Sequence, residues 1–170
     1  MLRFVFALFA MLVGVLANAQ VLDPRLKIES KYAPFYHGVA SGDPLEDRVI
    51  IWTRVSPLNA LAKEALVKWR IATDPELEHL VQEGEFLTGE FRDFTVKVDV
   101  KGLKPGTTYY YDFECEGRKS ITGRTKTTPA GNNISELRFG VVSCSNYEYG
   151  YFNAYRDMVN RNDLDAIIHL

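Results

Sequence analysis

The sequence has little of the chemistry that identifies a function by itself. It holds two cysteines in 170 residues and no Cys-x-x-Cys pair, which excludes a disulfide-dense scaffold and leaves no sign of a zinc knuckle. The formal net charge of −2 argues against a nucleic-acid binder held by a general basic field. The three histidines show neither His-x-His nor His-Glu-x-x-His spacing. What remains is an ordinary globular composition, 46% hydrophobic and 25% charged, long enough for one or two domains.

Long apolar runs are also absent, except at the amino terminus. Arg3 is followed by an apolar run over residues 4–16 and then by Ala17-Asn18-Ala19, the pattern of a Sec-type secretory signal peptide over residues 1–19. The run is shorter than the roughly twenty residues that a membrane-spanning helix needs, and an uncleaved anchor is the alternative. We expect cleavage after Ala19, export to the periplasm or the extracellular space, and no membrane span in the mature chain.

After a lead-in over residues 20–31, residues 32–128 have the pattern of a β-sandwich. Apolar or aromatic residues alternate with polar ones most clearly from Phe94 to Val100, and Pro105-Gly106 marks a turn. Several short strands with regular turns and no strong helix predict a fibronectin-III- or Ig-like sandwich in a mostly β protein. The segments expected to form strands are residues 49–55, 67–72, 94–100, 108–115 and 120–127. The tyrosines at 109–111 are interpreted as packing residues.

The period changes after a linker over residues 129–134. Residues 137–142 predict a buried strand, residues 151–162 a helix, and residues 165–170 a second buried strand. Strand, helix and strand in this order predict a βαβ unit with a parallel pair of strands. Such a unit cannot bury both faces of its sheet, so we expect residues 135–170 to be the start of a truncated α/β domain.

Candidate chemistry follows the first strand of that unit. In open α/β sheets ligands bind beyond the carboxyl ends of the strands, and the polar segment from Ser143 to Asn146 begins there. Cys144 could bind a transition metal or act as a nucleophile. The alternatives are a buried small hydrophobe and a disulfide with Cys115. His169, near the end of the second strand, could equally pack in the core or support a site.

The remaining histidines and the glycine-rich segment carry weaker signals. His79 lies in a polar stretch and is interpreted as solvated. His37 precedes a segment of small residues, 38–44, which we interpret as a tight loop. The two glycines of that segment do not form a phosphate-binding Gly-x-Gly-x-x-Gly motif, and no helix follows them.

Several segments in combination resemble the alkaline phosphatase D (PhoD-like) family. They include Phe35-Tyr36-His37-Gly38-Val39-Ala40-Ser41-Gly42-Asp43-Pro44 and Arg138-Phe139-Gly140-Val141-Val142-Ser143-Cys144-Ser145-Asn146, together with residues 49–54, 72–75, 93–98, 102–111 and 165–170. The resemblance implies a fibronectin-III-like domain before a calcineurin-like metallophosphoesterase domain. It also implies hydrolysis of small phosphate esters outside the cytoplasm, with the choice between monoesters and diesters open and protein partners unknown.

The resemblance also implies a metal role for Cys144, as a ligand of ferric iron (Fe3+) in a centre completed by calcium (Ca2+). Asn146, Tyr147 and His169 would then shape or support the pocket, and none of them is assigned as a ligand. In the complete enzyme the metals would activate a water for attack on phosphorus. The family's further ligands follow the point where this sequence stops at Leu170, so we expect no catalytic residue within the chain and no activity from these 170 residues alone.

Two other functions are compatible with the residues themselves. The first is a standalone secreted β-sandwich that binds a partner and carries a vestigial catalytic tail. The second is a thiol-dependent enzyme that uses Cys144, although no partner base is visible in the sequence. The βαβ segment favours the phosphatase, because a self-sufficient sandwich does not require it.

Overall fold

The computed structural model describes residues 29–131, 134, 136–145, 151–161 and 163–170. The predicted signal peptide lies outside these residues, as do Asn146 and Tyr147. Apart from the first two residues of the 3-10 helix η1 (Ser30–Tyr32), every element described below belongs to one compact unit, residues 32–170. Within the described part of the chain, no helix is both long and apolar enough to cross a membrane.

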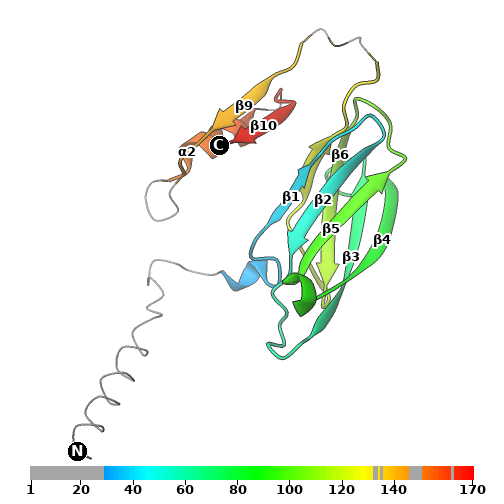
Figure 1. Cartoon of the computed structure of the whole chain (residues 1–170), viewed down its shortest axis with the longest axis vertical. Coiled ribbons are helices and arrows are strands. Elements are labelled where there is room, and N and C mark those ends of the chain that lie inside the picture. The colour runs from blue at the N-terminus through cyan, green and yellow to red at the C-terminus, as the bar shows by residue number, and fades with distance from the viewer. Residues whose placement is uncertain (1–28, 132–133, 135, 146–150, 162) are drawn as a thin grey trace, which may run out of the picture. The chain divides into compact units, whose positions relative to one another are not determined.

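Two antiparallel sheets form most of this unit (Figure 1). The first sheet contains three strands in the order β1-β2-β5. The second contains five strands, with β4, β3 and β6 side by side and both β7 and β8 paired to β6. The bounds are β1 Val39–Gly42, β2 Arg48–Arg54, β3 Glu64–Ala72, β4 Leu80–Gly89, β5 Thr95–Lys101, β6 Thr108–Cys115, β7 Arg118–Lys119 and β8 Gly123–Lys126, with a 3-10 helix η2, Glu90–Arg92, between β4 and β5.

The mostly β sandwich predicted from the sequence is confirmed, with three strands that the pattern did not indicate: the two-residue β7 and the longer strands β1 and β4. β1 covers part of the segment that was interpreted as a tight loop, so that interpretation is wrong for residues 39–42. β4 was not predicted because its ten residues mix Glu83, Gly84 and Glu85 with apolar residues. Both strands lie at sheet edges, where one side of the backbone faces no neighbouring strand and the demand for apolar residues is weaker.

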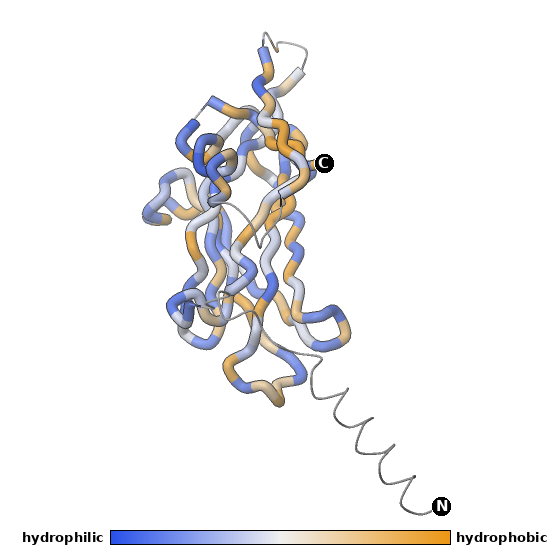
Figure 2. The backbone as a smooth tube through the Cα atoms, turned by 90° about the vertical axis from the view of Figure 1, so that its left-hand side faces the viewer, coloured by the Kyte–Doolittle hydropathy of each residue, from blue (hydrophilic) through white to orange (hydrophobic). Residues whose placement is uncertain are grey.

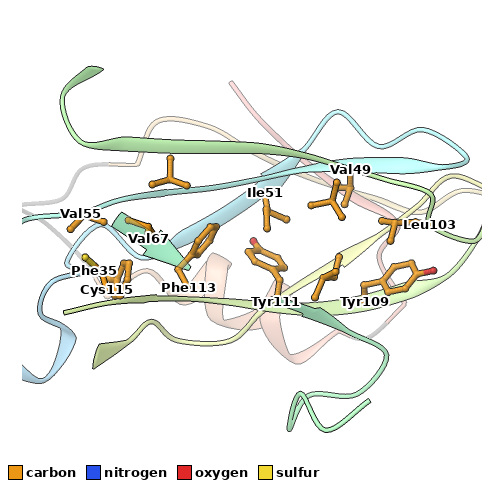
Figure 3. Packing of buried hydrophobic residues seen from close by; sticks show 13 residues of the cluster. Phe35, Val49, Ile51, Val55, Val67, Leu103, Tyr109, Tyr111, Phe113 and Cys115 are labelled. Carbon is orange, nitrogen blue, oxygen red and sulfur yellow. The ribbon is translucent and has the colours of Figure 1, made fainter. Parts of the chain in front are cut away.

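The core lies between the two sheets and is built from alternating residues of β2, β3, β5 and β6. Val49 and Ile51 of β2 are fully buried and point toward Tyr109 and Tyr111 of β6 (Figure 3). The cluster of buried residues is Phe35, Val49, Ile51, Val55, Val67, Ile71, Val96, Val100, Leu103, Tyr109, Tyr111, Phe113 and Cys115. Burial of alternate side chains on facing sheets is the main stabilising contribution in such a sandwich.

The buried tyrosines keep hydrogen-bond partners for their hydroxyl groups. The Tyr109 hydroxyl accepts a hydrogen bond from the backbone N–H of Lys104 at 2.8 Å. Burial raises the pKa of Tyr111 to about 12, and a hydrogen bond with Ser41 partly opposes that rise. The interpretation as packing residues is confirmed for Tyr109 and Tyr111, which are 1% and 2% exposed, whereas Tyr110 between them is half-buried and lies outside the core cluster.

One ion pair crosses the outer face of the five-stranded sheet. Arg70 donates from Nε to Oδ1 of Asp112 at 2.9 Å and from Nη2 to Oδ2 at 2.5 Å. Asp112 is only 4% exposed, and Arg70 lies opposite it in the register of β3 with β6. Two parallel hydrogen bonds satisfy both oxygens of this buried carboxylate, which otherwise would be costly to remove from water.

A small parallel unit follows the sandwich. β9 (Phe139–Val142) and β10 (Ala166–His169) pair in parallel, and α2 (Asn153–Asn160) lies between them in the chain. This confirms the predicted βαβ order, although the strands and the helix are shorter than expected. Gly140 faces the helix so closely that a Cβ there would lie 2.9 Å from Sδ of Met158.

The expectation that both strands of this unit are buried is wrong. Phe139, Val141 and Ile168 are 52%, 61% and 44% exposed. The tube is orange near the carboxyl terminus, where these apolar strands lie (Figure 2). The physical reason is that α2 covers the pair only in part. The adjacent residues Ile167 and Ile168, which point to opposite faces of β10, are 54% and 44% exposed, and Met158 is the residue of α2 that is buried.

We expect Gly123→Ala to destabilise the sandwich. A Cβ at position 123 would lie 2.3 Å from Cζ of the buried Tyr111 ring, so the ring or the strand must move. The expected loss is about 1–3 kcal/mol of unfolding free energy, the usual cost of overpacking a core. Gly42→Ala is the matched control on β1, since no heavy atom lies within 4 Å of its Cβ position. Urea denaturation measures both, and equal stability of the two variants would contradict the packing argument.

Candidate functional site

The carboxyl ends of β9 and β10 lie at one edge because the two strands run parallel. The backbone N–H of Leu170 donates to the carbonyl of Val142 at 2.9 Å, which joins the two chain segments at this edge. Cys144 follows two residues after β9 and has a φ of 54°, in the left-handed region that a non-glycine residue rarely adopts. Strained residues of this kind occur preferentially at functional turns.

The two cysteines have opposite environments. Both are free, Cys115 is buried and Cys144 is exposed. The alternatives of a Cys115–Cys144 disulfide and of a buried, purely structural Cys144 are therefore wrong. Burial raises the pKa of the Cys115 thiol to about 11, which keeps it protonated near neutral pH. Of the two thiols, Cys144 is the one placed to meet a metal ion or a substrate.

Three elements meet at the imidazole of His169. Nε2 of His169 lies 2.7 Å from the hydroxyl oxygen of Tyr155 on α2 and 3.4 Å from Oγ of Ser145. The rings of Tyr155 and His169 are stacked, 3° from parallel, with centroids 6.1 Å apart. His169 is exposed, so its interpretation as a core residue is wrong. It connects the helix to the turn that carries Cys144.

The sequence pattern missed the contribution of Tyr155. The spacing of Phe152, Tyr155 and Met158 indicated a helical apolar stripe, and of these only Met158 is buried. Tyr155 uses its ring against His169 and its hydroxyl as a hydrogen-bond partner. A tyrosine in an apolar stripe gives no local signal that its hydroxyl faces a histidine fourteen residues away.

The donor set at this edge suits a metal ion only in part. Sulfur of Cys144 is a soft donor of the kind that favours iron over calcium. Among the residues that the structure describes, no group of three or more His, Cys, Asp or Glu side chains could hold a metal ion. Asn146 and Tyr147 lie outside those residues. The described part of the chain therefore offers one candidate ligand and not a complete centre.

The other two histidines lie on the sandwich and belong to surface contacts. Nε2 of His37 lies 2.6 Å from Nη1 of Arg54, and Arg54 also binds both carboxylate oxygens of Asp93. The Arg54 guanidinium lowers the pKa of Asp93. His79 remains mostly exposed, as expected, with Nδ1 3.1 Å from Asp74.

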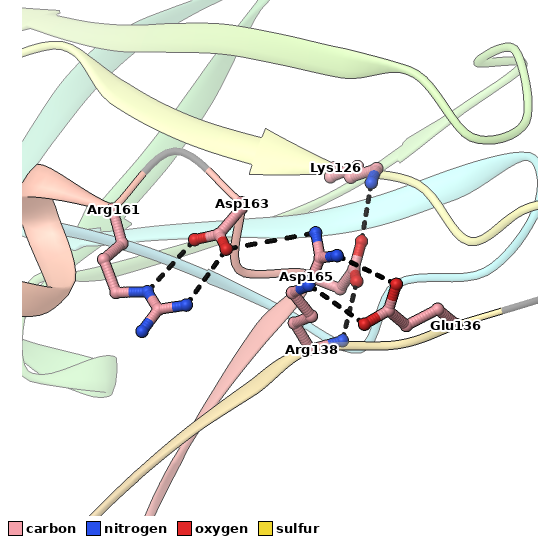
Figure 4. Close-up of polar contacts among 6 residues, drawn as sticks. All are labelled: Lys126, Glu136, Arg138, Arg161, Asp163 and Asp165. Atoms are coloured by element: carbon pink, nitrogen blue, oxygen red, sulfur yellow. Dashed lines mark hydrogen bonds and ion pairs between the residues drawn. The ribbon is translucent and has the colours of Figure 1, made fainter.

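A hollow of about 480 Å³ lies between β9 and α2, and its lining includes Arg138 and Arg161. Both guanidinium groups are already engaged by carboxylates, as Figure 4 shows. Arg138 donates to Glu136 at 3.1 and 2.8 Å, and Arg161 donates to Asp163 at 3.1 and 3.0 Å. Each pair joins residues two positions apart in the chain and is exposed to solvent, so these are local surface contacts.

These elements define the class of protein: an antiparallel β-sandwich of the fibronectin-III type that leads into a parallel α/β unit with a thiol at its carboxyl edge. Residues 20–129 match the family described as "PhoD-like phosphatase, N-terminal domain", and residues 139–170 match "PhoD-like phosphatase". The chain belongs to the PhoD-like phosphatase family, which confirms the resemblance found in the sequence.

Two relatives show how much of the family's length this sequence covers. It is 41% identical over 143 residues to alkaline phosphatase D of Bacillus subtilis (strain 168), which covers 81% of this chain and 24% of that protein. It is 40% identical to the solved structure of PhoD, with a TM-score of 0.75, over 84% of this chain and 28% of that one. The chain thus spans about a quarter of the curated relative.

We expect the two thiols to differ sharply in reactivity. In the native chain, Ellman's reagent should modify Cys144 rapidly, because it is exposed, and leave Cys115 unmodified, because it is buried with a raised pKa. Addition of urea should then release the second thiol. Cys144→Ser provides the control and should abolish the rapid phase. Rapid modification of two thiols in the native chain would contradict the buried placement of Cys115.

Proposed function

We propose that this chain supplies the amino-terminal part of an exported, metal-dependent phosphoric ester hydrolase of the alkaline phosphatase D type. The observation that carries the proposal is the 41% identity to alkaline phosphatase D over 81% of the chain, together with family matches that cover both the sandwich and the α/β segment. The match of residues 139–170 to the phosphatase family favours this function over a standalone binding module. The substrates proposed are small phosphate esters.

Cys144 is the proposed ligand from this chain for ferric iron, in a centre that calcium completes. Its support is the exposed, free thiol in a turn at the carboxyl edge of the parallel strands, together with the preference of soft sulfur for iron. When bound, such a metal pair supplies Lewis acidity and a water of lowered pKa. His169 contributes by contacting the turn that carries Cys144, through Ser145, and Tyr155 contributes by contacting His169.

The same chemistry supports the proposal that these residues do not hydrolyse phosphate esters alone. One thiolate does not fill the coordination sphere of an iron ion, which takes several ligands. The described residues add no cluster of three metal-binding side chains to it. We propose that most of the remaining ligands of the centre come from parts of the protein outside the described residues.

Cys144→Ala in the complete enzyme should lower bound iron and activity together, because the variant removes an anionic ligand that no neighbouring side chain replaces. Iron content measured by plasma mass spectrometry and hydrolysis of p-nitrophenyl phosphate test this. Cys115→Ala is the matched control, since it removes a buried thiol far from the proposed centre in sequence and should retain iron. Full iron content with full activity in Cys144→Ala would exclude Cys144 as a ligand.

Export is proposed from the first nineteen residues, and it predicts a defined mature terminus. When the chain is produced in a bacterial host, the exported protein should begin at Gln20, because Ala17-Asn18-Ala19 provides the small residues that signal peptidase requires. Amino-terminal sequencing of the periplasmic or secreted fraction measures this. Ala19→Arg should block processing, and an unprocessed wild-type chain in the membrane fraction would instead indicate an anchor.

A further inference from the structure

A single carboxylate joins the start of β10 to two other parts of the chain. Oδ1 of Asp165 accepts a hydrogen bond from Nζ of Lys126 at 2.6 Å, and Oδ2 accepts one from the backbone N–H of Arg138 at 2.9 Å (Figure 4). Lys126 is the last residue of β8 in the sandwich, whereas Arg138 directly precedes β9. Asp165 thus contacts both the sandwich and the neighbouring parallel strand.

The contact with Arg138 is reciprocal. The backbone N–H of Asp165 donates to the carbonyl of Arg138 at 2.8 Å, while its carboxylate accepts from the N–H of the same residue. These two bonds precede the first register pair of the strands, Phe139 with Ala166. Side chains alternate between the two faces of a strand, so a slip by one position would reverse which side chains face α2. With only four residues each, β9 and β10 have few ladder bonds to prevent it. The bonds at Asp165 oppose such a slip.

Lys126 belongs to a well-anchored part of the sandwich. It pairs with Thr108 in the register of β6 with β8. Just beyond it, the N–H of Thr128 donates to Leu45 at 3.1 Å, and the carbonyl of Thr128 accepts from Gly106 at 2.9 Å. The lysine therefore presents its charge from a well-anchored strand end, so that little backbone freedom is lost when it binds Asp165.

The charges around Asp165 leave Lys126 as its side-chain partner. The Arg138 guanidinium is bound by Glu136 at 2.8 Å and lies 3.9 Å from Asp163, so it is engaged elsewhere. The side chain of Asp165 is 23% exposed and that of Lys126 39% exposed, which reduces screening by solvent without removing it. Lys126, followed by the N–H of Arg138, lowers the pKa of Asp165.

We propose that Asp165 is a positioning residue that sets the register of β9 with β10 and, through Lys126, fastens this pair to the β-sandwich. The contact is at the amino-terminal edge of the parallel pair, whereas Cys144 and His169 are at its carboxyl edge. The sandwich therefore braces the α/β unit from the edge opposite the thiol and does not cover the site. The proposal does not depend on the metal role of Cys144.

Nitrogen-15 NMR relaxation of the 170-residue chain tests the fastening. In the wild type, amides of β6 and of β9 should report one rotational correlation time. Lys126→Met and Asp165→Asn should each separate the two values, since either removes the ion pair. Lys97→Met is the matched control, a lysine on the exposed face of β5, and should behave as the wild type. Two separate correlation times in the wild type would overturn the proposal that the Lys126–Asp165 pair fastens the parallel strands to the sandwich.

Hydrogen exchange of the Arg138 amide tests the register function. Asp165→Ala removes both the carboxylate acceptor and the ion pair, and should speed this exchange by roughly fivefold or more, as expected for loss of a hydrogen bond to a charged group. The Phe113 amide in the sandwich serves as the internal reference for folding. Asp165→Ala could also unfold β10. Lys126→Met avoids this because the substituted residue lies in the sandwich, and it should speed exchange of the Arg138 amide by a smaller factor. Unchanged exchange in both variants would overturn the proposal.

The coupling of the two residues provides a further test. If they act as one contact, Lys126→Met adds nothing to the effect of Asp165→Asn in the double variant. The wild-type contact should also weaken as the pH falls through the folded-state pKa of Asp165, which lies below its unfolded value, because protonation removes the charge that Lys126 binds. Lys126→Met should lose that pH dependence. Additive effects, or an unaltered pH profile in Lys126→Met, would contradict a direct ion pair.

Discussion

The burial of alternate side chains between two antiparallel sheets is the constraint on which this structure depends. Each strand of the sandwich can place every second residue in the core, and β2, β5 and β6 do so with Val49, Val96 and Tyr111. The fit is close enough that Gly123 must lack a side chain where the Tyr111 ring passes. Outside the core, the Arg70–Asp112 pair satisfies the most buried carboxylate. The result is a well-packed sandwich, and the chain leaves it at the end of β8.

The parallel unit is held by different forces. Its strands are short and largely exposed, and only Met158 of α2 is buried. Apolar burial is therefore limited here, and hydrogen bonds and an ion pair at its amino-terminal edge, which converge on Asp165, add to it. This arrangement leaves the opposite edge, with Cys144 and His169, accessible. We propose that the two edges of this small sheet have separate roles, attachment to the sandwich at one edge and metal binding at the other.

The candidate site combines a local signal with a nonlocal one. Cys144 could be selected from the sequence because a thiol among polar residues after an apolar strand is unusual, and its exposure agrees with that selection. The contact of His169 with Tyr155 and Ser145 could not be predicted, since it depends on how α2 crosses the strand pair. The pairing of Arg54 with His37 and Asp93 was missed for the same reason, because the partners come from three separate segments.

Local patterns predicted those features that each segment decides from its own residues. The alternation of β5, the turn at Pro105-Gly106 and the strand–helix–strand order after the linker are of this kind, and the family resemblance followed from short motifs. Edge strand β4, the exposure of β9 and β10, and the Lys126–Asp165 contact were decided only by tertiary structure. The physical reason is that periodicity records which face of an element is apolar, whereas burial and ion pairing depend on which element lies opposite that face.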